Sequence, residues 1–229
     1  MITHVDAPPA GELELLRAQM RTVDMGVCLS SFTMRYLIKR GIPKAKLCFI
    51  NPAHDDNLNP RKIRIGIFSR IYWDGRKREQ MLVELSHGIS PNDFAFSIMG
   101  RGWNEIVSDL RKRGFQVNYI QEFSREHYQE MLESIDYYLY LGLDEGSMGF
   151  IDALACGVPT IVTNQGFHLD VPRGTNYLFS ETKQLKRIFE QIAAPKKNRE
   201  NSVKDWNWAS YADKHIAMWE KVLARSPRR

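Results

Sequence analysis

The sequence has little cysteine, and its cysteines are arranged for neither a metal site nor a disulfide framework. The three, Cys28, Cys48 and Cys156, are odd in number and widely spaced. No C-x-x-C pair suggests zinc, and no regular spacing suggests a disulfide-stapled secreted domain. A reducing compartment fits this pattern, so we expect a cytoplasmic protein, with contact to the inner face of the membrane left open.

Long apolar runs are also missing. The sequence has no stretch of about 18 apolar residues, the length from which a membrane-spanning helix is expected. Near the amino terminus, Asp6 and two prolines stand where a secretory signal would need an apolar run. We therefore expect at most peripheral membrane contact, made through basic surface residues.

Two further absences argue against classes of ligand. The strongest apolar segment, residues 63–68, is followed by SRIYWDG and not by a G-x-G-x-x-G motif, which disfavours a dinucleotide-dependent oxidoreductase. The net charge is +5, but the basic clusters are dispersed and carry no recognition motif. We therefore expect no nucleic-acid partner.

What the sequence does contain is a regular alternation of short apolar segments with amphipathic ones. The segment IRIGIF, residues 63–68, is almost continuously apolar, which is typical of a strand buried on both faces. The alternation predicts right-handed βαβ units, and therefore an α/β fold with a doubly wound parallel sheet. We expect strands at residues 27–29, 46–50, 63–68, 94–99, 117–120, 137–141 and 160–163. We expect helices at residues 32–40, 79–86, 103–113, 124–134, 150–155, 181–192 and 206–223.

Ligands of such sheets bind at the carboxyl ends of the strands, where the strand order reverses. The segment GLDEGSMGFIDALACGVP, residues 142–159, places an acidic, glycine-rich loop there, directly before a helix. Unpaired N–H groups and a partial positive charge suit that helix end to a phosphate. The acids Asp144, Glu145 and Asp152 could accept hydrogen bonds from sugar hydroxyls, or they could only cap the helix and complement its dipole.

Cations follow a second strand of the same sheet. Arg70 comes directly after IRIGIF, and Arg76 and Lys77 follow six and seven residues later. In sugar transfer the leaving group is a nucleoside diphosphate with about three negative charges, and cations held nearby stabilise the charge that develops. Such an arrangement can take the place of a metal ion.

Five segments together resemble the second half of family 4-type glycosyltransferases of the GT-B fold, over residues 23–223 or so. The segment EGSMGFIDALACGVPTIVT looks like the acidic loop and helix of that family, and FSRIYWDGRKRE looks like its diphosphate-binding loop. IMGRGW resembles the glycine turn after the second strand. Residues 23–55 resemble the end of the acceptor-side domain with its hinge, and WNWASYADKHIAMWEKVL resembles the terminal helix.

The resemblance implies a set of site residues. Arg70 and either Arg76 or Lys77 would hold the diphosphate, and Asp152 would bind the ribose hydroxyls. The acid that faces the donor sugar is either Glu145, which keeps the family's Glu-Gly pair, or Asp144, which keeps its seven-residue gap to Asp152. Arg70 and these two acids are the expected catalytic residues. The full set expected to bind the donor is Ser69, Arg70, Arg76, Lys77, Gly146, Ser147, Met148, Gly149, Asp152 and His168.

The sequence also gives expectations for three other side chains. His168, in the segment Gln165–His168 that would line the cleft, is either a site residue or an ordinary core or surface histidine. His4 lies near a short apolar segment, THVD, and the family can place a histidine of the acceptor-side domain against the donor sugar. Cys156 is expected to pack on the buried side of its helix.

The resemblance also implies the domain organisation and the activity. We expect a remnant of the acceptor-side domain and hinge at residues 1–58, a nucleotide-sugar-binding Rossmann-like domain at 59–203, and a terminal helix at 204–229 that packs back toward the first segment. The implied activity is retaining transfer from a nucleotide-diphospho-sugar, without a metal ion or other cofactor, to a glycan or lipid acceptor in polysaccharide or glycolipid assembly. The alternative is a nucleotide-sugar-binding module or subunit without activity of its own. The short first domain predicts exposed apolar surface, and hence self-association or a partner chain.

Overall fold

The computed structural model describes residues 11–171 and 173–225, which form two compact units. One unit comprises Pro60–Asn198. The other combines the chain up to Asn59 with the chain from Arg199 onward.

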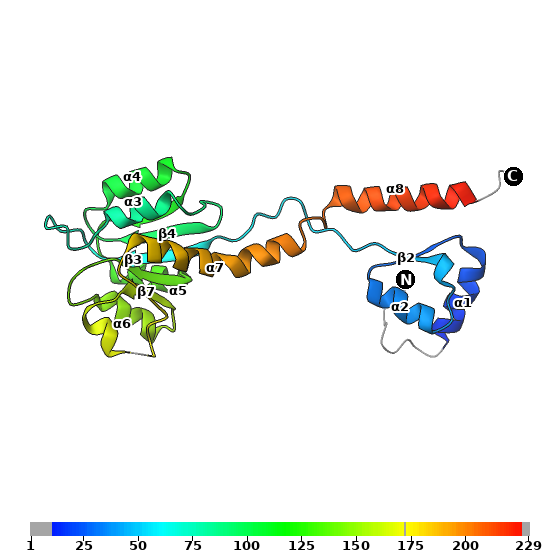
Figure 1. Cartoon of the computed structure of the whole chain (residues 1–229), viewed down its shortest axis with the longest axis horizontal. Coiled ribbons are helices and arrows are strands. Elements are labelled where there is room, and N and C mark those ends of the chain that lie inside the picture. The colour runs from blue at the N-terminus through cyan, green and yellow to red at the C-terminus, as the bar shows by residue number, and fades with distance from the viewer. Residues whose placement is uncertain (1–10, 172, 226–229) are drawn as a thin grey trace. The chain divides into compact units, whose positions relative to one another are not determined.

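The larger unit is built on six parallel strands in the order β5-β4-β3-β6-β7-β8 (Figure 1). The strands are β3 (Ile63–Phe68), β4 (Phe94–Met99), β5 (Gln116–Ile120), β6 (Tyr137–Tyr140), β7 (Thr160–Thr163) and β8 (Tyr177–Phe179). The first three strands of the unit extend the sheet in one direction from β3, and the next three extend it in the other. The strand order therefore reverses between β3 and β6, and the predicted doubly wound α/β fold is confirmed.

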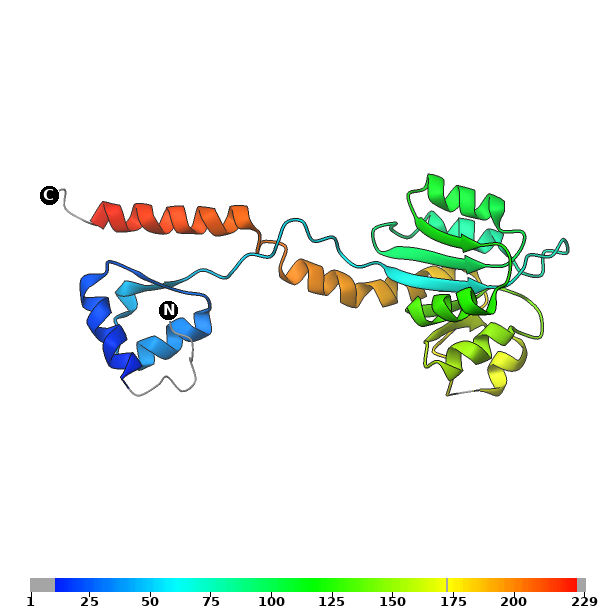
Figure 2. The same ribbon diagram turned by 180° about the vertical axis from the view of Figure 1, so that it is seen from behind.

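Helices cover both faces of this sheet, which lies between them in Figures 1 and 2. They are α3 (Gln80–Ser86), α4 (Asn104–Lys112), α5 (Arg125–Ser134), α6 (Met148–Ala155) and α7 (Thr182–Ser202). Side chains of α3, α4 and α7 share one buried cluster with the sheet, and those of α5 and α6 share a second.

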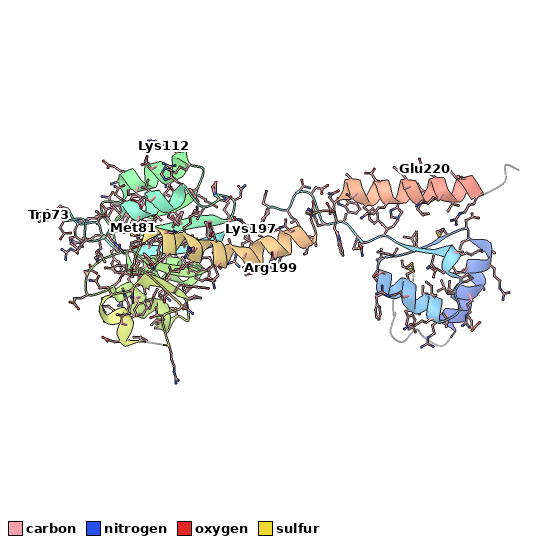
Figure 3. All side chains as sticks on the ribbon, in the orientation of Figure 1. Trp73, Met81, Lys112, Lys197, Arg199 and Glu220 are labelled. Atoms are coloured by element: carbon pink, nitrogen blue, oxygen red, sulfur yellow. The ribbon has the colours of Figure 1, made fainter. Side chains whose placement is uncertain are left out.

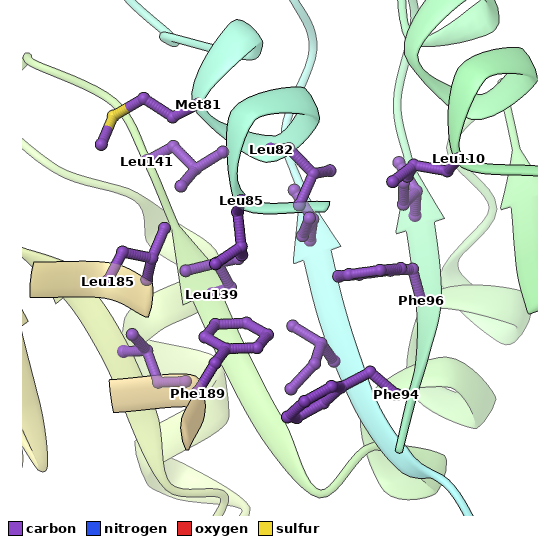
Figure 4. Packing of buried hydrophobic residues seen from close by; sticks show 14 of the residues in the cluster. Met81, Leu82, Leu85, Phe94, Phe96, Leu110, Leu139, Leu141, Leu185 and Phe189 are labelled. Atoms are coloured by element: carbon purple, nitrogen blue, oxygen red, sulfur yellow. The ribbon is translucent and has the colours of Figure 1, made fainter. Parts of the chain in front are cut away.

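The strand β3 shows why a parallel strand is apolar throughout. Its Ile65 and Ile67 belong to the first cluster and Phe68 to the second, because alternate side chains point to opposite faces. In the first cluster, Leu82 and Leu85 of α3 and Phe189 of α7 pack over the strands (Figure 4). Burial on both faces is thus the reason for the near-continuous apolar pattern.

The smaller unit has a modest core. It contains α1 (Glu12–Thr22), β1 (Gly26–Cys28), α2 (Ser31–Lys39), a 3-10 helix (Lys44–Lys46), β2 (Leu47–Phe49) and α8 (Trp208–Arg225). The strands β1 and β2 pair in parallel. The buried cluster consists of Met20, Cys28, Leu37, Ile42 and Leu47, and α8 buries none of its residues.

Several elements differ from the sequence-based expectation. The helix α1, the three-residue strand β8 and the 3-10 helix Gly166–Asp170 are not predicted. The helix α6 begins at Met148 rather than at residue 150, and α7 continues to Ser202 instead of ending at residue 192. Pro195 lies inside α7; its ring is exposed, and the burial of Ala193 and Lys196 on either side offsets the backbone hydrogen bond that proline cannot donate.

No helix within residues 11–171 and 173–225 is long and apolar enough to cross a membrane.

Candidate functional site

A cavity of about 980 Å³ opens in the larger unit at the carboxyl ends of its central strands. Its walls come from the segments that follow β3, β4 and β5, from α5 (Arg125–Ser134) and from α6 with the loop before it. The cavity therefore spans the point between β3 and β6 where the strand order reverses, which is where doubly wound sheets bind their ligands.

The segments after β3 and β4 are locked together beside this cavity. Gly100 has φ 133°, and a Cβ atom there would lie 2.2 Å from the Ser69 carbonyl oxygen. The same carbonyl accepts a hydrogen bond of 2.6 Å from the Trp103 indole nitrogen. Only glycine permits this close approach, so the turn predicted at residues 100–102 fixes the direction of the loop that carries the cations.

The three consecutive cations of that loop take three different positions. Lys77 is buried and lines the cavity. Arg76 does not line it; its Nε lies 2.9 Å from the Asp74 carboxylate and its guanidinium stacks on the ring of Tyr72. Arg78 donates to the backbone carbonyls of Leu141 and Ser180 at 2.8 and 2.9 Å, and burial lowers the pKa of its guanidinium. Arg76 and Lys77 are the two alternatives for the second diphosphate ligand beside Arg70. Of these two, the structure places Lys77 at the cavity.

Arg70 and Ser69, directly after β3, also line the cavity. The side chain of Arg70 is exposed and lies near the ring of Tyr72, 5.5 Å from its centroid. Trp73, in the same loop, is 99% exposed and extends away from the domain (Figure 3). The loop therefore presents one buried and one exposed cation to the cavity.

Lys77 is held by an aspartate and a tyrosine. Its Nζ donates to the Tyr140 hydroxyl at 2.5 Å and to the Asp144 carboxylate at 2.6 Å, and the Tyr140 hydroxyl also donates to Asp144. Burial raises the pKa of the Asp144 carboxyl, but the hydrogen bonds from Lys77 and Tyr140 outweigh it and leave that pKa below its ordinary value. Burial and the bond to Asp144 raise the pKa of Tyr140. The three groups thus form an aspartate anion, a lysine cation and a neutral tyrosine.

Neither of the two acids expected to face the donor sugar lines the cavity. Asp144 is turned toward Lys77 and Tyr140. Glu145 is exposed, and its carbonyl oxygen accepts a hydrogen bond of 3.0 Å from the Phe167 amide. Gly166, at φ 66°, allows this approach, because a Cβ atom there would lie 2.3 Å from the Glu145 carbonyl oxygen.

The start of α6 forms another part of the cavity wall. Gly146, Ser147, Met148 and Gly149 line the cavity, and Ser147 is the N-cap residue of the helix. The first N–H groups of a helix have no partner within the helix and favour an anion. The structure therefore brings together the backbone segment and the cations that the sequence predicts for a phosphate.

Asp152 lies one turn further along α6 and lines the cavity. Its carboxylate accepts a hydrogen bond of 2.6 Å from the Tyr128 hydroxyl. Burial and this hydrogen bond raise the pKa of Tyr128, which keeps its proton. The predicted ribose ligand is therefore held in a defined orientation.

His168 lies beneath the loop rather than in the cavity. Its ring is fully buried, and its Nε2 accepts a hydrogen bond of 3.3 Å from the Ser147 amide. Its Nδ1 lies 3.4 Å from the Thr163 carbonyl oxygen, to which the neutral ring donates. Burial lowers the pKa of this histidine. The contact with Ser147 makes it a support for the start of α6, and none of residues 165–168 lines the cavity.

Cys156 is not the packing residue that the sequence suggests. Its side chain is exposed and lines the cavity. The helix α6 turns Phe150 and Ala153 toward the core, whereas Cys156 lies at its C-cap and is not among the buried residues of the helix. That expectation is therefore wrong.

Three tyrosines that support the site were not predicted from the sequence. The hydroxyls of Tyr128, Tyr138 and Tyr140 donate to Asp152, Ser147 and Asp144, respectively. A buried tyrosine hydroxyl requires a partner, and Tyr138 and Tyr140 follow each other at the two-residue spacing that puts both on one face of a strand. That spacing in YYLY, directly before the loop, is the signal that was available.

Two expectations concern residues or ligands apart from the cavity. Within residues 11–171 and 173–225, no three His, Cys, Asp or Glu side chains gather as metal ligands. His4, the predicted contact from the acceptor-side domain, lies outside the described residues.

Comparison with known proteins gives a result at the level of the fold. No known protein family matches the chain, and no curated protein matches it. Solved structures do match, and they identify the fold as that of the GT-B glycosyltransferases, as the sequence resemblance predicts. Sucrose-phosphate synthase from Thermosynechococcus elongatus matches with a TM-score of 0.51 and 16% identity, over 99% of this chain and 65% of that chain.

Two further similar structures have TM-scores slightly lower. Anabaena HepE in complex with UDP and glucose has a TM-score of 0.47 and 14% identity, over 91% of this chain and 66% of that chain. A glycosyltransferase from Rickettsia africae has a TM-score of 0.49 and 15% identity, over 95% of this chain and 68% of that chain. The chain thus spans about two thirds of the length of these proteins.

Proposed function

We propose that this chain is the donor-binding part of a retaining glycosyltransferase, which takes a sugar from a nucleotide-diphospho-sugar and transfers it to a glycan or lipid acceptor. The observation that carries the proposal is the cavity at the β3–β6 switch point. Arg70 and Lys77 line this cavity together with the start of α6 and Asp152. Two cations, a helix N-terminus and a carboxylate match a diphosphate with a ribose beside it.

The geometry supports a role for each part. The guanidinium of Arg70 can bind phosphate oxygens with two parallel hydrogen bonds, and Lys77 adds a compact charge beside it. The backbone N–H groups of Met148 and Gly149 at the start of α6 add further donors, whereas those of Gly146 and Ser147 already donate to Asp144 and His168. Because the diphosphate gains charge as the sugar departs, these groups favour the transition state over the bound donor. We propose that they do so without a metal ion.

Asp152 is proposed to bind the ribose hydroxyls. A carboxylate can accept two hydrogen bonds from a pair of neighbouring hydroxyls. The Tyr128 hydroxyl donates to Oδ2 of Asp152, so Oδ1 of the same carboxylate has no tyrosine partner. Glu145 is proposed as the sugar contact, because the carboxylate of Asp144 is occupied by Lys77 and Tyr140.

A second candidate function is a nucleotide-sugar-binding module or subunit that does not transfer sugar on its own. The position of the two acids favours it, because neither Asp144 nor Glu145 lines the cavity. Binding and turnover must therefore be measured separately.

Binding is tested by a thermal-shift panel of UDP, GDP and ADP with their sugar conjugates, with and without EDTA. A ligand that binds only the folded state raises the melting temperature by mass action. We expect the nucleotides of one base to raise the melting temperature, and EDTA should not abolish this increase. The increase should be lost in Arg70→Ala and kept in the control Arg76→Ala. No shift with any nucleotide would contradict the proposal.

Turnover is tested by following release of the nucleoside diphosphate from the bound conjugate, with candidate acceptors. Transfer at an ordinary enzyme rate supports the transferase. Binding without transfer or hydrolysis supports the binding module.

A further inference from the structure

Lys77 reaches the cavity from a fixed position. Two of the three N–H groups of its ammonium are taken by the Tyr140 hydroxyl and the Asp144 carboxylate, at 2.5 and 2.6 Å. Its Nζ also lies 4.8 Å from the centroid of the Tyr140 ring and 5.7 Å from that of Tyr72. Within the part of the chain that the structure describes, no third hydrogen-bond acceptor is assigned to Nζ, and Lys77 lines the cavity.

Asp144 is committed to this arrangement by both carboxylate oxygens. One oxygen accepts from Lys77, and the other accepts from the Tyr140 hydroxyl and, at 3.3 Å, from the Gly146 amide. Its side chain is about four-fifths buried, and that of Lys77 about nine-tenths, since 20% and 10% remain exposed. Removing a charged group from water in this way is costly unless it is paired, so the two charges and the tyrosine are mutually dependent.

We infer that Tyr140 is a positioning residue for the donor diphosphate: together with Asp144 it seats Lys77 so that the remaining N–H of the ammonium serves a phosphate oxygen. Asp144 is then the counter-ion of Lys77 and not a ligand of the donor sugar. The inference rests on the proposed function for its ligand. A cationic side chain that is already held in one position loses less conformational entropy when it binds the phosphate.

The direct test is Tyr140→Phe, which removes one oxygen atom and keeps the ring in the core. Isothermal titration calorimetry measures its affinity for the nucleoside diphosphate and for the parent nucleoside. Losing the hydrogen bond between Lys77 and the Tyr140 hydroxyl should weaken diphosphate binding about fivefold and leave nucleoside binding unchanged. Tyr137→Phe is the matched control, because Tyr137 lies on the same strand outside the cavity lining; it should change neither affinity.

A double variant distinguishes positioning from a general loosening of the fold. If Tyr140 acts through Lys77, then Tyr140→Phe should cost no further diphosphate affinity in a Lys77→Met background. An equal loss in both backgrounds, or an equal loss of nucleoside affinity, would overturn the inference. Melting temperatures of the same proteins verify that each variant is folded.

A measurement without any ligand separates this inference from the proposed function. Carboxyl NMR should find the pKa of Asp144 below its ordinary value of about 3.9 in the wild type and closer to that value in both Lys77→Met and Tyr140→Phe. If neither variant changes the pKa of Asp144, then Tyr140 and Asp144 do not hold Lys77 in place, and the inference is refuted. If the pKa of Asp144 changes in the variants but no nucleotide binds, then Tyr140 and Asp144 do hold Lys77. In that case the proposed function fails, and so does the role of these residues in donor binding.

Discussion

The two walls of the cavity are built in different ways. The cation wall, formed by Ser69, Arg70 and Lys77 after β3, presents charged side chains. The helix wall, formed by residues 146–149 and Asp152, presents the backbone N–H groups of Met148 and Gly149 and one carboxylate. Both walls depend on residues behind them. Lys77 of the cation wall is held by Tyr140 and Asp144, whereas the helix wall depends on two other tyrosine hydroxyls and a buried histidine. The comparison separates residues that meet a ligand from residues that hold them in place.

The largest effect is expected where the cation wall is locked to its neighbour. Gly100→Ala would place a Cβ atom 2.2 Å from the Ser69 carbonyl oxygen at φ 133°, so we expect a loss of about 3 kcal/mol in the free energy of unfolding. Urea denaturation measures it. Gly157→Ala is the control: its φ is also positive, but the added atom meets nothing within 4 Å, so about 1 kcal/mol is expected. Equal losses would show that the close approach is not what requires glycine.

The next effect compares two adjacent cations. Lys77→Ala should weaken nucleoside diphosphate binding about tenfold, because a charge-assisted hydrogen bond to phosphate is lost. Arg76→Ala should change it less than about twofold, since Arg76 pairs with Asp74 at the surface. Titration calorimetry of both variants measures the difference, and a larger loss in Arg76→Ala would reverse the assignment of the two.

The helix wall should respond to a different ligand. Tyr128→Phe frees Asp152 from its hydrogen bond of 2.6 Å, so we expect about fivefold weaker binding of the nucleoside, through its ribose. Binding of inorganic pyrophosphate, which has no ribose, should stay unchanged. Equal losses for both ligands would remove the distinction between the two walls.

The smallest effect concerns the buried support of the helix wall. Burial lowers the pKa of His168, so the unfolded state takes up the proton more readily than the folded state. The contribution of the neutral ring to stability is complete above the unfolded pKa of about 6.5 and falls as the pH drops below it. Melting temperatures between pH 7.5 and about 5 should therefore fall less steeply in His168→Gln, whose amide can still accept the Ser147 N–H. Parallel slopes would contradict this.

The sequence predicted the larger unit well because its signals are strong and local. Strands such as β3 and β4 are buried on both faces and therefore apolar throughout, and the alternation of elements fixes the topology. The three-residue strand β8 is too short to carry a comparable signal. The helix α1 was not predicted, although Leu13, Leu16 and Met20 recur at helical spacing and pack in the core of the smaller unit. The helix α7 continues through Pro195 to Ser202, past the expected end at residue 192.

The candidate site was predicted in part for the same reason. The positions of Arg70, in the loop after β3, and of Asp152, in the first turns of α6, follow from the order of the elements. The choice between Arg76 and Lys77 does not, because neighbouring side chains in a loop point in directions that only the backbone path decides. The support from Tyr128, Tyr138 and Tyr140 depends on contacts between residues distant in the sequence, or on which face of a strand meets the loop.

The most direct test of the account is a crystal structure of the protein with the nucleoside diphosphate that gives the largest thermal shift. The account predicts the diphosphate between Arg70, Lys77 and the start of α6, with the ribose hydroxyls on the Asp152 carboxylate. A nucleotide bound elsewhere, or one in this cavity with its phosphates turned away from both cations, would contradict it.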